Sequence, residues 1–406
     1  MIKLSDPNIK VIVFGQHYMN SLGQVRSFGE VGCRPDVVWQ SVVAGPLSES
    51  KSKDEIALSK YIDHFEKVST LEDGLEYIIR EYHDRDTRYI ISTDSDLVVS
   101  LLNSRYDELK DRFVFFNASQ PGRLNQYLAK DAQCRLAEQF GLRVPRSELV
   151  HRGELPKVVT YPLVTKTVDS FSRQWKKNYN ICRTEQELLE AYESIPLDEV
   201  LLQEFIEREN EVAFEGISFN QGEELYMPIQ GEYIRIGDFG YGSWKRNEAY
   251  HYGEVLKDKI QQIFKAIKYS GVFEIEFLKT KDGDLYFLEI NFRHTQYNHA
   301  LTDMGVNLCT IYAESELNGR LCVPDIDIQP RTVMNERMEY FAYIETKKIR
   351  LRDWIKDIKK TDSFYIYDRR DLKPLFQSIK KYLIMEMVQA FYRYRRRIRS
   401  LWKKTH

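Results

Sequence analysis

The stretch GVFEIEFLKTKDGDLYFLEINFR, residues 271–293, is the most informative part of this 406-residue chain. Apolar and polar residues alternate on both sides of its centre, a pattern typical of two strands that each bury one face. The centre contains Asp282 and Gly283, a pair favoured in two-residue hairpin loops, and such a loop pairs Lys281 with Asp284. The stretch therefore predicts an antiparallel hairpin of defined register.

The predicted register separates the side chains of the hairpin onto two faces. It places Glu276 opposite Glu289 and Glu274 opposite Asn291, with Arg293 further along the same polar face. The other face is apolar and is expected to lie in a core, and its residues are Phe273, Ile275, Phe277, Leu288, Ile290 and Phe292. One face of the hairpin is therefore structural, and the other is a candidate site.

The two opposed carboxylates of this hairpin require compensation. Like charges directly opposed across a sheet repel each other and raise each other's pKa. A divalent cation between Glu276 and Glu289, with the amide oxygen of Asn291 as a further ligand, would provide it. Mg²⁺ suits such a site because it takes a few protein oxygens and completes its shell with phosphate and water. The alternative is a solvated acidic face that Arg293 and nearby lysines screen.

The spacing acid–x12–E-I-N-x-R, from Glu276 to Arg293, resembles the metal site of the ATP-grasp superfamily. The resemblance implies that Glu276, Glu289 and Asn291 bind Mg²⁺, or Mn²⁺ in its place, against the phosphates of ATP. It also implies that Arg293 is a catalytic residue that contacts the transferred phosphate or the acyl group.

Further motifs follow in the order in which ATP-grasp chains present them. A predicted helix near Lys130 leads to a G-L-x-V-P sequence, and the runs YPLVTK and VLLQEFIE lie between it and the hairpin. The resemblance implies that Lys130 and Lys166 bind ATP, with Lys166, the last residue of YPLVTK, at the α- and β-phosphates and active in catalysis. It assigns a second phosphate contact to the loop WKKNYNI, where we choose Lys177 and leave Lys176 open.

The run VLLQEFIE, residues 200–207, resembles the interdomain hinge that binds the adenine edge in this superfamily. The residues that the resemblance assigns to adenine are Gln203, Glu204 and Ile206. Glu211 falls at the position of a ribose-binding acid, and Glu207 and Glu209 lie close enough to compete for that role.

Within the superfamily, most of residues 10–320 is similar to the D-aspartate ligases and related carboxylate–amine ligases. The similarity rests on GQHYMNSLGQVRSFGEVG near the start and on SGVFEIEF, LEINFR and GVNL, whereas HTQYNHAL after Arg293 departs from the family. The resemblance implies a ligase that uses ATP to activate a small-molecule carboxylate as an acyl phosphate and joins it to an amine acceptor. An amino acid and a cell-envelope precursor are the candidate substrates. Arg26, His294 and Asn298 are candidate substrate contacts.

The rest of the chain predicts the domain organisation. Short β-branched runs alternate with helical patterns over residues 1–118, which indicates an α/β domain with a parallel sheet that precedes the ATP-grasp fold. Residues 119–330 have the α+β pattern of two ATP-grasp subdomains, and the smaller one, at about 155–205, would act as a lid. Residues 331–406 form a helical, basic C-terminal extension. The glycine-rich IGDFGYGSW, residues 236–244, is a candidate substrate or lid loop, or an ordinary hairpin connection.

The C-terminal extension ends in a basic segment. Residues 391–406 contain seven arginines and lysines and no acid, although the whole chain has a formal charge of -2. Apolar residues recur at steps of three and four from Phe376 to Trp402, which predicts a helix with one apolar and one basic face. Such a helix is typical of peripheral contact with an anionic membrane. The alternative is that the apolar face packs on the protein's own core.

The composition argues against several other classes of protein. The acidic remainder of the chain would repel a nucleic acid, and no nucleic-acid-binding motif is visible, so we expect no such partner and keep binding through the tail as the alternative.

Five scattered cysteines without a CxxC pair argue against a zinc site or a disulfide framework. Without a secretory signal or an apolar run of roughly 18 residues, we expect a cytoplasmic enzyme, in part at the inner face of the membrane. A carboxylase or a peptide-tail ligase would share the nucleotide site and stays open.

Overall fold

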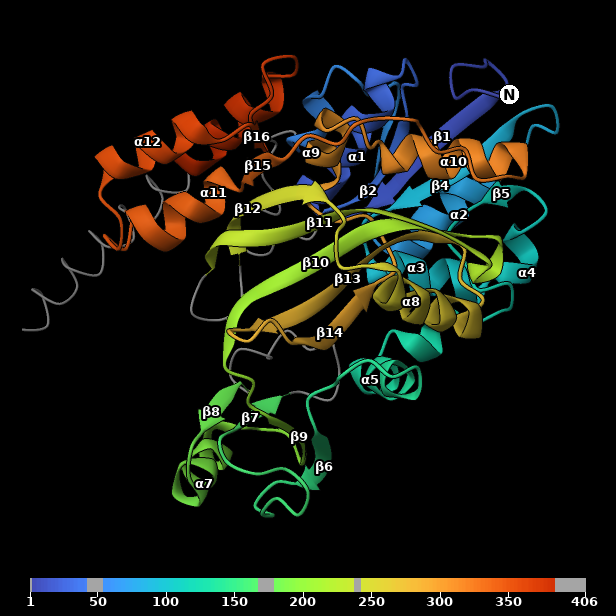
Figure 1. Ribbon diagram of the computed structural model, residues 1–406. Coiled ribbons are helices and arrows are strands. Elements are labelled where there is room, and N and C mark those ends of the chain that lie inside the picture. The colour runs from blue at the N-terminus through green and yellow to red at the C-terminus, as the bar shows by residue number, and fades with distance from the viewer. Residues whose placement is uncertain (1, 42–53, 167–178, 237–241, 384–406) are drawn as a thin grey trace, which may run out of the picture.

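The computed structural model describes residues 2–41, 54–166, 179–236 and 242–383. Figure 1 shows a parallel sheet near the N-terminus, a long and mostly antiparallel sheet beside it and a small third sheet at one end of the molecule. Among the residues within these ranges, no helix is long and apolar enough to cross a bilayer. The predictions for Lys176, Lys177 and the part of the tail after residue 383 lie outside the described residues.

The first sheet has five parallel strands in the order β3-β2-β1-β4-β5. Helices α1 and α10 pack on one of its faces, and α2 and α3 pack on the other. Its strands are β1 (Ile9–Gly15), β2 (Asp36–Gln40), β3 (Phe65–Val68), β4 (Arg88–Thr93) and β5 (Phe113–Val114). The helices between them are α1 (Tyr18–Glu30), η1 (Ile56–Leu58), α2 (Leu71–Glu81), α3 (Asp96–Ser104) and α4 (Tyr106–Leu109). This arrangement confirms the predicted parallel α/β fold.

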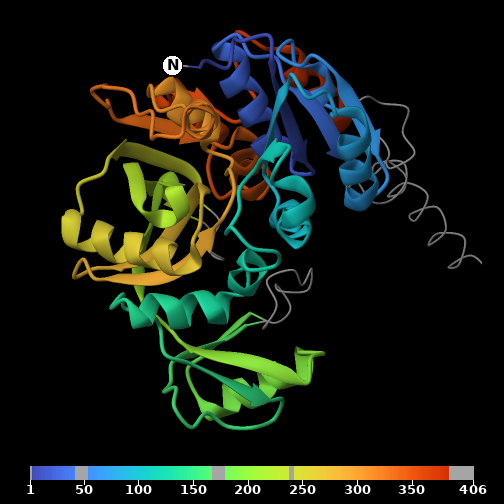
Figure 2. The same cartoon turned by 90° about the vertical axis from the view of Figure 1, so that its right-hand side faces the viewer.

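The small sheet is antiparallel, with the strand order β6-β9-β7-β8. Figure 2 shows it in green at one end of the molecule. Its elements are β6 (Ser147–His151), β7 (Leu163–Lys166), β8 (Asn180–Cys182), α7 (Glu185–Ser194) and β9 (Glu199–Glu204), and it follows η2 (Leu124–Tyr127) and α5 (Lys130–Gln139). The side chain of Thr184 accepts a hydrogen bond from the backbone N–H of Glu187 and so caps the N-terminus of α7.

The large sheet has seven strands in the order β14-β13-β10-β11-β12-β15-β16. Its strands are β10 (Arg208–Phe219), β11 (Glu224–Ile236), β12 (Gly242–Ala249), β13 (Gly271–Thr280), β14 (Leu285–Asn291), β15 (Arg331–Met334) and β16 (Ser363–Phe364). The helical elements of this region are η3 (Asn220–Gly222), α8 (Glu254–Ile267), α9 (Asn298–Asp303) and α10 (Leu308–Asn318). Apolar side chains of α5, α8 and α10 pack with the apolar face of β10, β13 and β14 in the largest core. The polar face of the hairpin lies on the other side of the sheet.

The C-terminal extension is joined to the large sheet, which the sequence did not predict. β15 pairs with β12, and β16 adds to β15 in parallel. The helical elements are α11 (Glu336–Glu339), the π-helical turn η4 (Tyr340–Ile344) and α12 (Leu351–Lys360), followed by a helix that begins at residue 373. Arg235 at the end of β11 forms ion pairs with Glu339 and Asp357, so side chains as well as strands attach the extension.

The predicted hairpin, β13–β14, has the expected register at the site and a different loop at the turn. Glu276 lies opposite Glu289, and Glu274 lies opposite Asn291. The loop has three residues, 281–283, because the N–H of Thr280 donates to the carbonyl of Asp284 at 3.0 Å and Gly283 adopts a φ of 85°. The predicted pairing of Lys281 with Asp284 is therefore wrong.

A β-bulge reconciles the longer loop with the correct register at the site. Phe277 lies opposite Phe287, while the next pair toward the site is Glu276 with Glu289, so Leu288 is the extra residue of β14. Phe287 is fully buried and takes the core position that the sequence assigned to Leu288, which is only half-buried. The bulge returns both carboxylates to the polar face.

Candidate active site

The centre of the candidate site is a pair of carboxylates on neighbouring strands. Glu276 of β13 and Glu289 of β14 are direct cross-strand neighbours. Burial raises the pKa of Glu276 well above its usual range, and the charges of Glu274 and Glu289 raise it further. A half-buried carboxylate with two acidic neighbours favours a proton or a cation. The structure thus brings together the two acids that the sequence predicted as metal ligands.

The amide of Asn291 connects these acids. Its Nδ2 donates to Oε2 of Glu274 and to Oε1 of Glu276, each at 3.1 Å, and its Oδ1 accepts from Nη2 of Arg293 at 2.9 Å. The predicted metal ligand is the amide oxygen, and this oxygen faces Arg293. Coordination through Oδ1 would therefore require the amide group to turn over.

Two lysines reach the same site from different elements. Nζ of Lys130, the first residue of α5, forms an ion pair with Oε2 of Glu289. Nζ of Lys166, at the end of β7, donates to Oε1 of Gln203 at 2.6 Å. Burial lowers the pKa of Lys166 to about 8, and the positive charge of Lys130 lowers it further. Burial acts against the charge of Glu289 as well, but Lys130 outweighs it and the pKa of that carboxyl is lowered.

Arg293 links the hairpin to the first sheet. Its Nε lies 3.2 Å from Oδ1 of Asp96, the first residue of α3. Burial opposes the charge of the guanidinium, but Asp96 and Glu274 outweigh it and the pKa of Arg293 is raised. The site therefore lies where the carboxyl end of β4, which leads into α3, meets the polar face of the large sheet. Crevices at the carboxyl ends of parallel strands are common binding positions in α/β proteins.

The predicted adenine and ribose residues are only partly oriented toward the lysines. Gln203 is buried and bonds Lys166, whereas the side chain of Glu204 accepts from Nε of Arg146 at 3.3 Å. The carboxylate of Glu211 is held by Arg208, and burial raises the pKa of Glu211 to about 7.

The remaining predicted hinge residues are more exposed to solvent than Gln203 and Glu211. Ile206 is half-buried, and the competing acids Glu207 and Glu209 are exposed. Of the three acids proposed for the ribose, Glu211 is thus the buried one, and its ion pair with Arg208 would have to open for a ribose hydroxyl to bind.

The three predicted substrate contacts have structural partners instead. Arg26 is fully buried in α1, where its Nε pairs with Asp371 at 3.2 Å and its Nη atoms donate to backbone carbonyls of residues 365, 366 and 371. His294 is 1% exposed, and burial lowers its pKa to about 3. Asn298 is also 1% exposed and donates to Ser27 and Cys309. None of these side chains presents a surface to a substrate, so we correct their assignment.

The sequence analysis did not identify Lys245 as a buried cation on the polar face of the large sheet. Lys245 of β12 is fully buried, with Nζ 3.3 Å from Oε1 of Glu215 and 3.7 Å from Oε1 of Glu274. Nζ also lies 3.9 Å from the centre of the Tyr297 ring. Glu274 in turn bonds Asn291, so Lys245 is connected to the carboxylate pair. The sequence feature that could have predicted a buried cation is Glu215, an isolated acid in the apolar run of β10.

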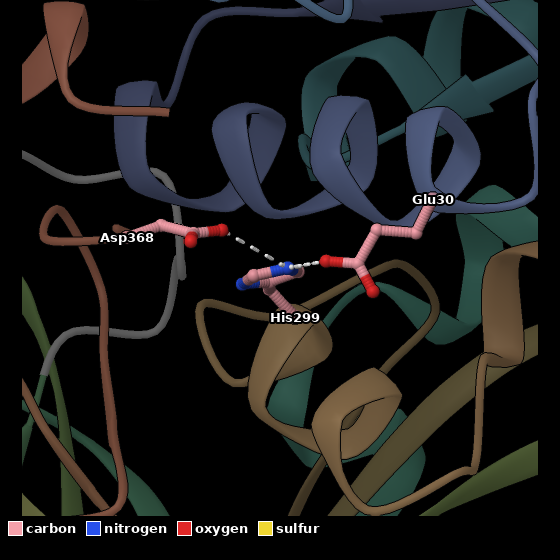
Figure 3. A group of neighbouring side chains, drawn as sticks. All are labelled: Glu30, His299 and Asp368. Atoms are coloured by element: carbon pink, nitrogen blue, oxygen red, sulfur yellow. Dashed lines mark hydrogen bonds and ion pairs between the residues drawn. The ribbon is translucent and has the colours of Figure 1, made fainter. Parts of the chain in front are cut away.

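Another group of side chains has the spacing of a metal site and already contains a cation. Nε2 of His299 lies 2.7 Å from Oε1 of Glu30 and 3.8 Å from Oδ2 of Asp368, as Figure 3 shows. The guanidinium of Arg370 contacts the same two acids, at 2.8 Å from Glu30 and 3.1 Å from Asp368. Since Arg370 already binds both carboxylates, we assign this group a structural role in joining α1, α9 and the extension.

Comparisons with known proteins identify the fold. No protein-family model matches the chain. An N5-carboxyaminoimidazole ribonucleotide synthase of Staphylococcus epidermidis is 22% identical over 320 residues, which is 74% of this chain and 78% of the relative. The crystal structure of an L-amino acid ligase from Bacillus licheniformis has a TM-score of 0.56 at 16% identity, and the match covers 80% of this chain and 78% of the ligase. The biotin carboxylase domain of the Hydrogenobacter thermophilus 2-oxoglutarate carboxylase, in complex with magnesium ADP and bicarbonate, has a TM-score of 0.59 at 15% identity, with 80% and 73% covered.

These similarities confirm the predicted architecture. The chain has the ATP-grasp fold, a parallel α/β sheet followed by two α+β sheets, and its two carboxylates lie on the large sheet with lysines from α5 and β7 beside them. At identities of 22% or less the comparisons establish the fold, and the reaction has to be argued from the site.

Proposed function

We propose that this protein is an ADP-forming ligase that uses ATP to activate a carboxylate and joins it to an amine. The observation that supports this best is the Glu276–Glu289 pair, surrounded by Lys130, Lys166 and Arg293, in an ATP-grasp fold. Three cations beside two acids suit a site that holds polyphosphate together with a divalent metal ion. The chemistry of such a site is phosphoryl transfer.

The donor atoms fit Mg²⁺. Glu276 and Glu289 supply hard carboxylate oxygens, and the acidic neighbours Glu274 and Glu289 raise the pKa of Glu276, an effect that a bound cation would reverse. The amide oxygen of Asn291 would complete the protein ligands after the amide turns over. When bound, Mg²⁺ would neutralise charge that develops on the transferring phosphoryl group.

The protein's own residues act mainly by position and charge. Lys166 and Lys130 hold the phosphates of ATP, and Arg293 neutralises the phosphoryl group during transfer. An oxygen of the substrate carboxylate attacks the γ-phosphorus, the bond to the β-phosphate oxygen breaks, and ADP leaves. The amine nitrogen then attacks the carbonyl carbon of the acyl phosphate, inorganic phosphate leaves, and the nitrogen gives up a proton to water. Lys245 keeps Glu274, and through it Asn291, in place beside the site.

The substrates are a small-molecule carboxylate and an amine acceptor. The motifs that resemble D-aspartate ligases favour an amino acid as the carboxylate and a cell-envelope precursor as the amine. A second candidate is N-carboxylation with bicarbonate, which is favoured by the sequence relative named as an N5-carboxyaminoimidazole ribonucleotide synthase. Both reactions would use the same nucleotide site.

Release of ADP from ATP and Mg²⁺ across a panel of carboxylates, with bicarbonate as one member, tests this proposal. We expect one carboxylate to stimulate ADP release, and hydroxylamine to capture its acyl phosphate as a hydroxamate. Stimulation by bicarbonate alone would favour the carboxylase. Carboxylate-dependent ADP release that yields no hydroxamate would point to another phosphoryl acceptor and contradict the ligase.

The pH dependence of nucleotide binding tests the assignment of Lys166. Its pKa is about 8 in the free protein, and the nucleotide phosphates should raise it. If bound nucleotide raises the pKa of Lys166, the affinity for nucleotide is at its full value below pH 8. Between the free-state and bound-state pKa values the affinity falls, by roughly tenfold per pH unit. We expect the Kd for ADP to increase between pH 8 and pH 9 in the wild type. Lys166→Arg keeps its charge across this range and should show no such increase; an equal increase in both proteins would refute the assignment.

A further inference from the structure

The helix that begins at residue 373 is fixed to the body of the protein by one face. Nζ of Lys381 donates to Oε2 of Glu55 at 2.6 Å. The ring of Tyr382 packs against Tyr340 and Phe341, with centroids 5.8 and 5.4 Å apart. Leu375 packs on the small core between α9 and the extension. The described part of this helix is therefore held in a defined orientation.

An adjacent face of this helix is apolar and exposed. Phe376, Ile379 and Leu383, at steps of three and four residues, are 62%, 46% and 55% exposed. We call these three residues the C-terminal apolar face. A single exposed apolar residue is ordinary, but a row of three along a fixed helix is not explained by the protein's own packing. The alternative considered from the sequence, that the stripe packs on the protein's own core, is wrong for these three residues.

α12 has a similar character. Leu351 and Ile355 lie one helical turn apart and are 55% and 44% exposed, and none of the residues of α12 is buried. Basic residues flank them on the same helix, at Arg352, Lys356, Lys359 and Lys360. Tyr340 contacts both Trp354 of α12 and Tyr382 of the last helix, so one aromatic cluster supports the two exposed apolar surfaces.

The sequence beyond residue 383 is rich in positive charge. Residues 391–406 contain seven arginines and lysines and no acid. The partner of this region must therefore accept exposed apolar side chains and strong positive charge together. An anionic bilayer does both, because its surface attracts bases and its interface accepts aromatic and aliphatic side chains. A nucleic acid would attract the bases but would gain little from Phe376, Ile379 and Leu383.

We propose that the C-terminal apolar face and the basic segment 391–406 dock this protein on an anionic membrane surface. The interaction is peripheral and reversible, since it combines a short row of apolar side chains with charges that salt screens. It is independent of the reaction at Glu276 and Glu289.

Flotation of the full chain with lipid vesicles tests this docking. We expect binding to vesicles that contain about one third phosphatidylglycerol, no binding to pure phosphatidylcholine, and a loss of at least roughly tenfold in bound fraction between 50 and 500 mM salt. Equal binding to both kinds of vesicle, or binding to neither, would overturn the proposal. Displacement from anionic vesicles by duplex DNA at a lower charge concentration than the lipid would favour a nucleic-acid partner instead.

Two triple variants with matched controls separate the apolar and the basic contributions. Phe376→Ser with Ile379→Ser and Leu383→Ser should reduce binding to anionic vesicles at least tenfold, whereas the same change at Leu149, Leu155 and Val158, which are 51%, 40% and 57% exposed on the small sheet and its loop, should not. Arg395→Glu with Arg396→Glu and Arg397→Glu should abolish binding. The control for charge reverses three exposed bases elsewhere, Arg85, Lys157 and Arg183. Equal losses in variants and controls would show that binding is non-specific and would contradict the proposal. ADP release should be unchanged in every variant.

Discussion

Replacing Glu276 with glutamine is expected to slow ADP formation by roughly 10³-fold, since a metal-binding carboxylate supports several kcal/mol of transition-state stabilisation. The same change should leave the melting temperature of the metal-free protein unchanged or raise it. Burial and the neighbouring charges of Glu274 and Glu289 hold the pKa of Glu276 well above its usual range, so the charged form costs stability. A neutral amide of the same shape removes that cost and can still accept the hydrogen bond from Asn291.

Glu289→Gln gives an informative contrast. Its loss of activity should be similar, but the protein should become slightly less stable, because Glu289 has a lowered pKa and pairs with Lys130. Glu224→Gln, an exposed carboxylate on β11 of the same sheet, is the control and should change neither property. Turnover and thermal melts without added metal measure both effects. Near-normal turnover of either Glu276→Gln or Glu289→Gln would remove these residues from the metal site.

Two sequence features were used to predict the register of the hairpin, and the predicted pairing is correct only beyond the bulge, at the site. Alternation fixes which side chains share a face, and the turn sequence limits which residues can pair. The loop itself was wrong by one residue, because Gly283 adopts a positive φ in a three-residue turn. The bulge at Leu288 restores the register at the site. A bulge within an apolar run has no local sequence signature, so it could not be predicted. The position of the two acids was therefore correct although the turn was not.

The misassigned substrate contacts have a different cause. An arginine in a loop-and-helix segment near a predicted site reads as a substrate contact, but the partner of Arg26 is Asp371, 345 residues further along the chain. Pairing over such a separation depends on how the extension returns to α1, and sequence spacing carries no information on that. The same holds for His294 and Asn298, which are enclosed by α10 through Cys309.

The network around Lys245 shows why buried charges are hard to read from a pattern. In SWKRNEA, the sequence of β12 from Ser243, lysine and arginine are adjacent and look equally solvated, yet Lys245 is fully buried and Arg246 is exposed. The difference comes from β10 and β13, which place Glu215 and Glu274 within reach of Lys245. The one sequence feature that indicates a nearby cation is Glu215, an acid within the apolar run of β10.

Replacing Lys245 with methionine is expected to destabilise the protein by about 3–5 kcal/mol, because the change leaves Glu215 and Glu274 buried without their shared cation. The loss should be smaller at low pH. Burial already raises the pKa of Glu215, and without Lys245 that pKa rises further, so protonation limits the cost as the pH falls. Urea unfolding at pH 8 and pH 6 measures the difference.

The matched control for this variant is Lys279→Met, in the same sheet. Lys279 pairs with Glu232 where both side chains are partly exposed, at 25% and 29%, so its loss should cost less than about 1 kcal/mol. Adding Glu215→Gln to Lys245→Met should recover part of the stability, because it removes one of the two uncompensated charges. If Lys245→Met is as stable as the control at pH 8, the carboxylates have another source of compensation, and Lys245 does not hold the polar face of the sheet together.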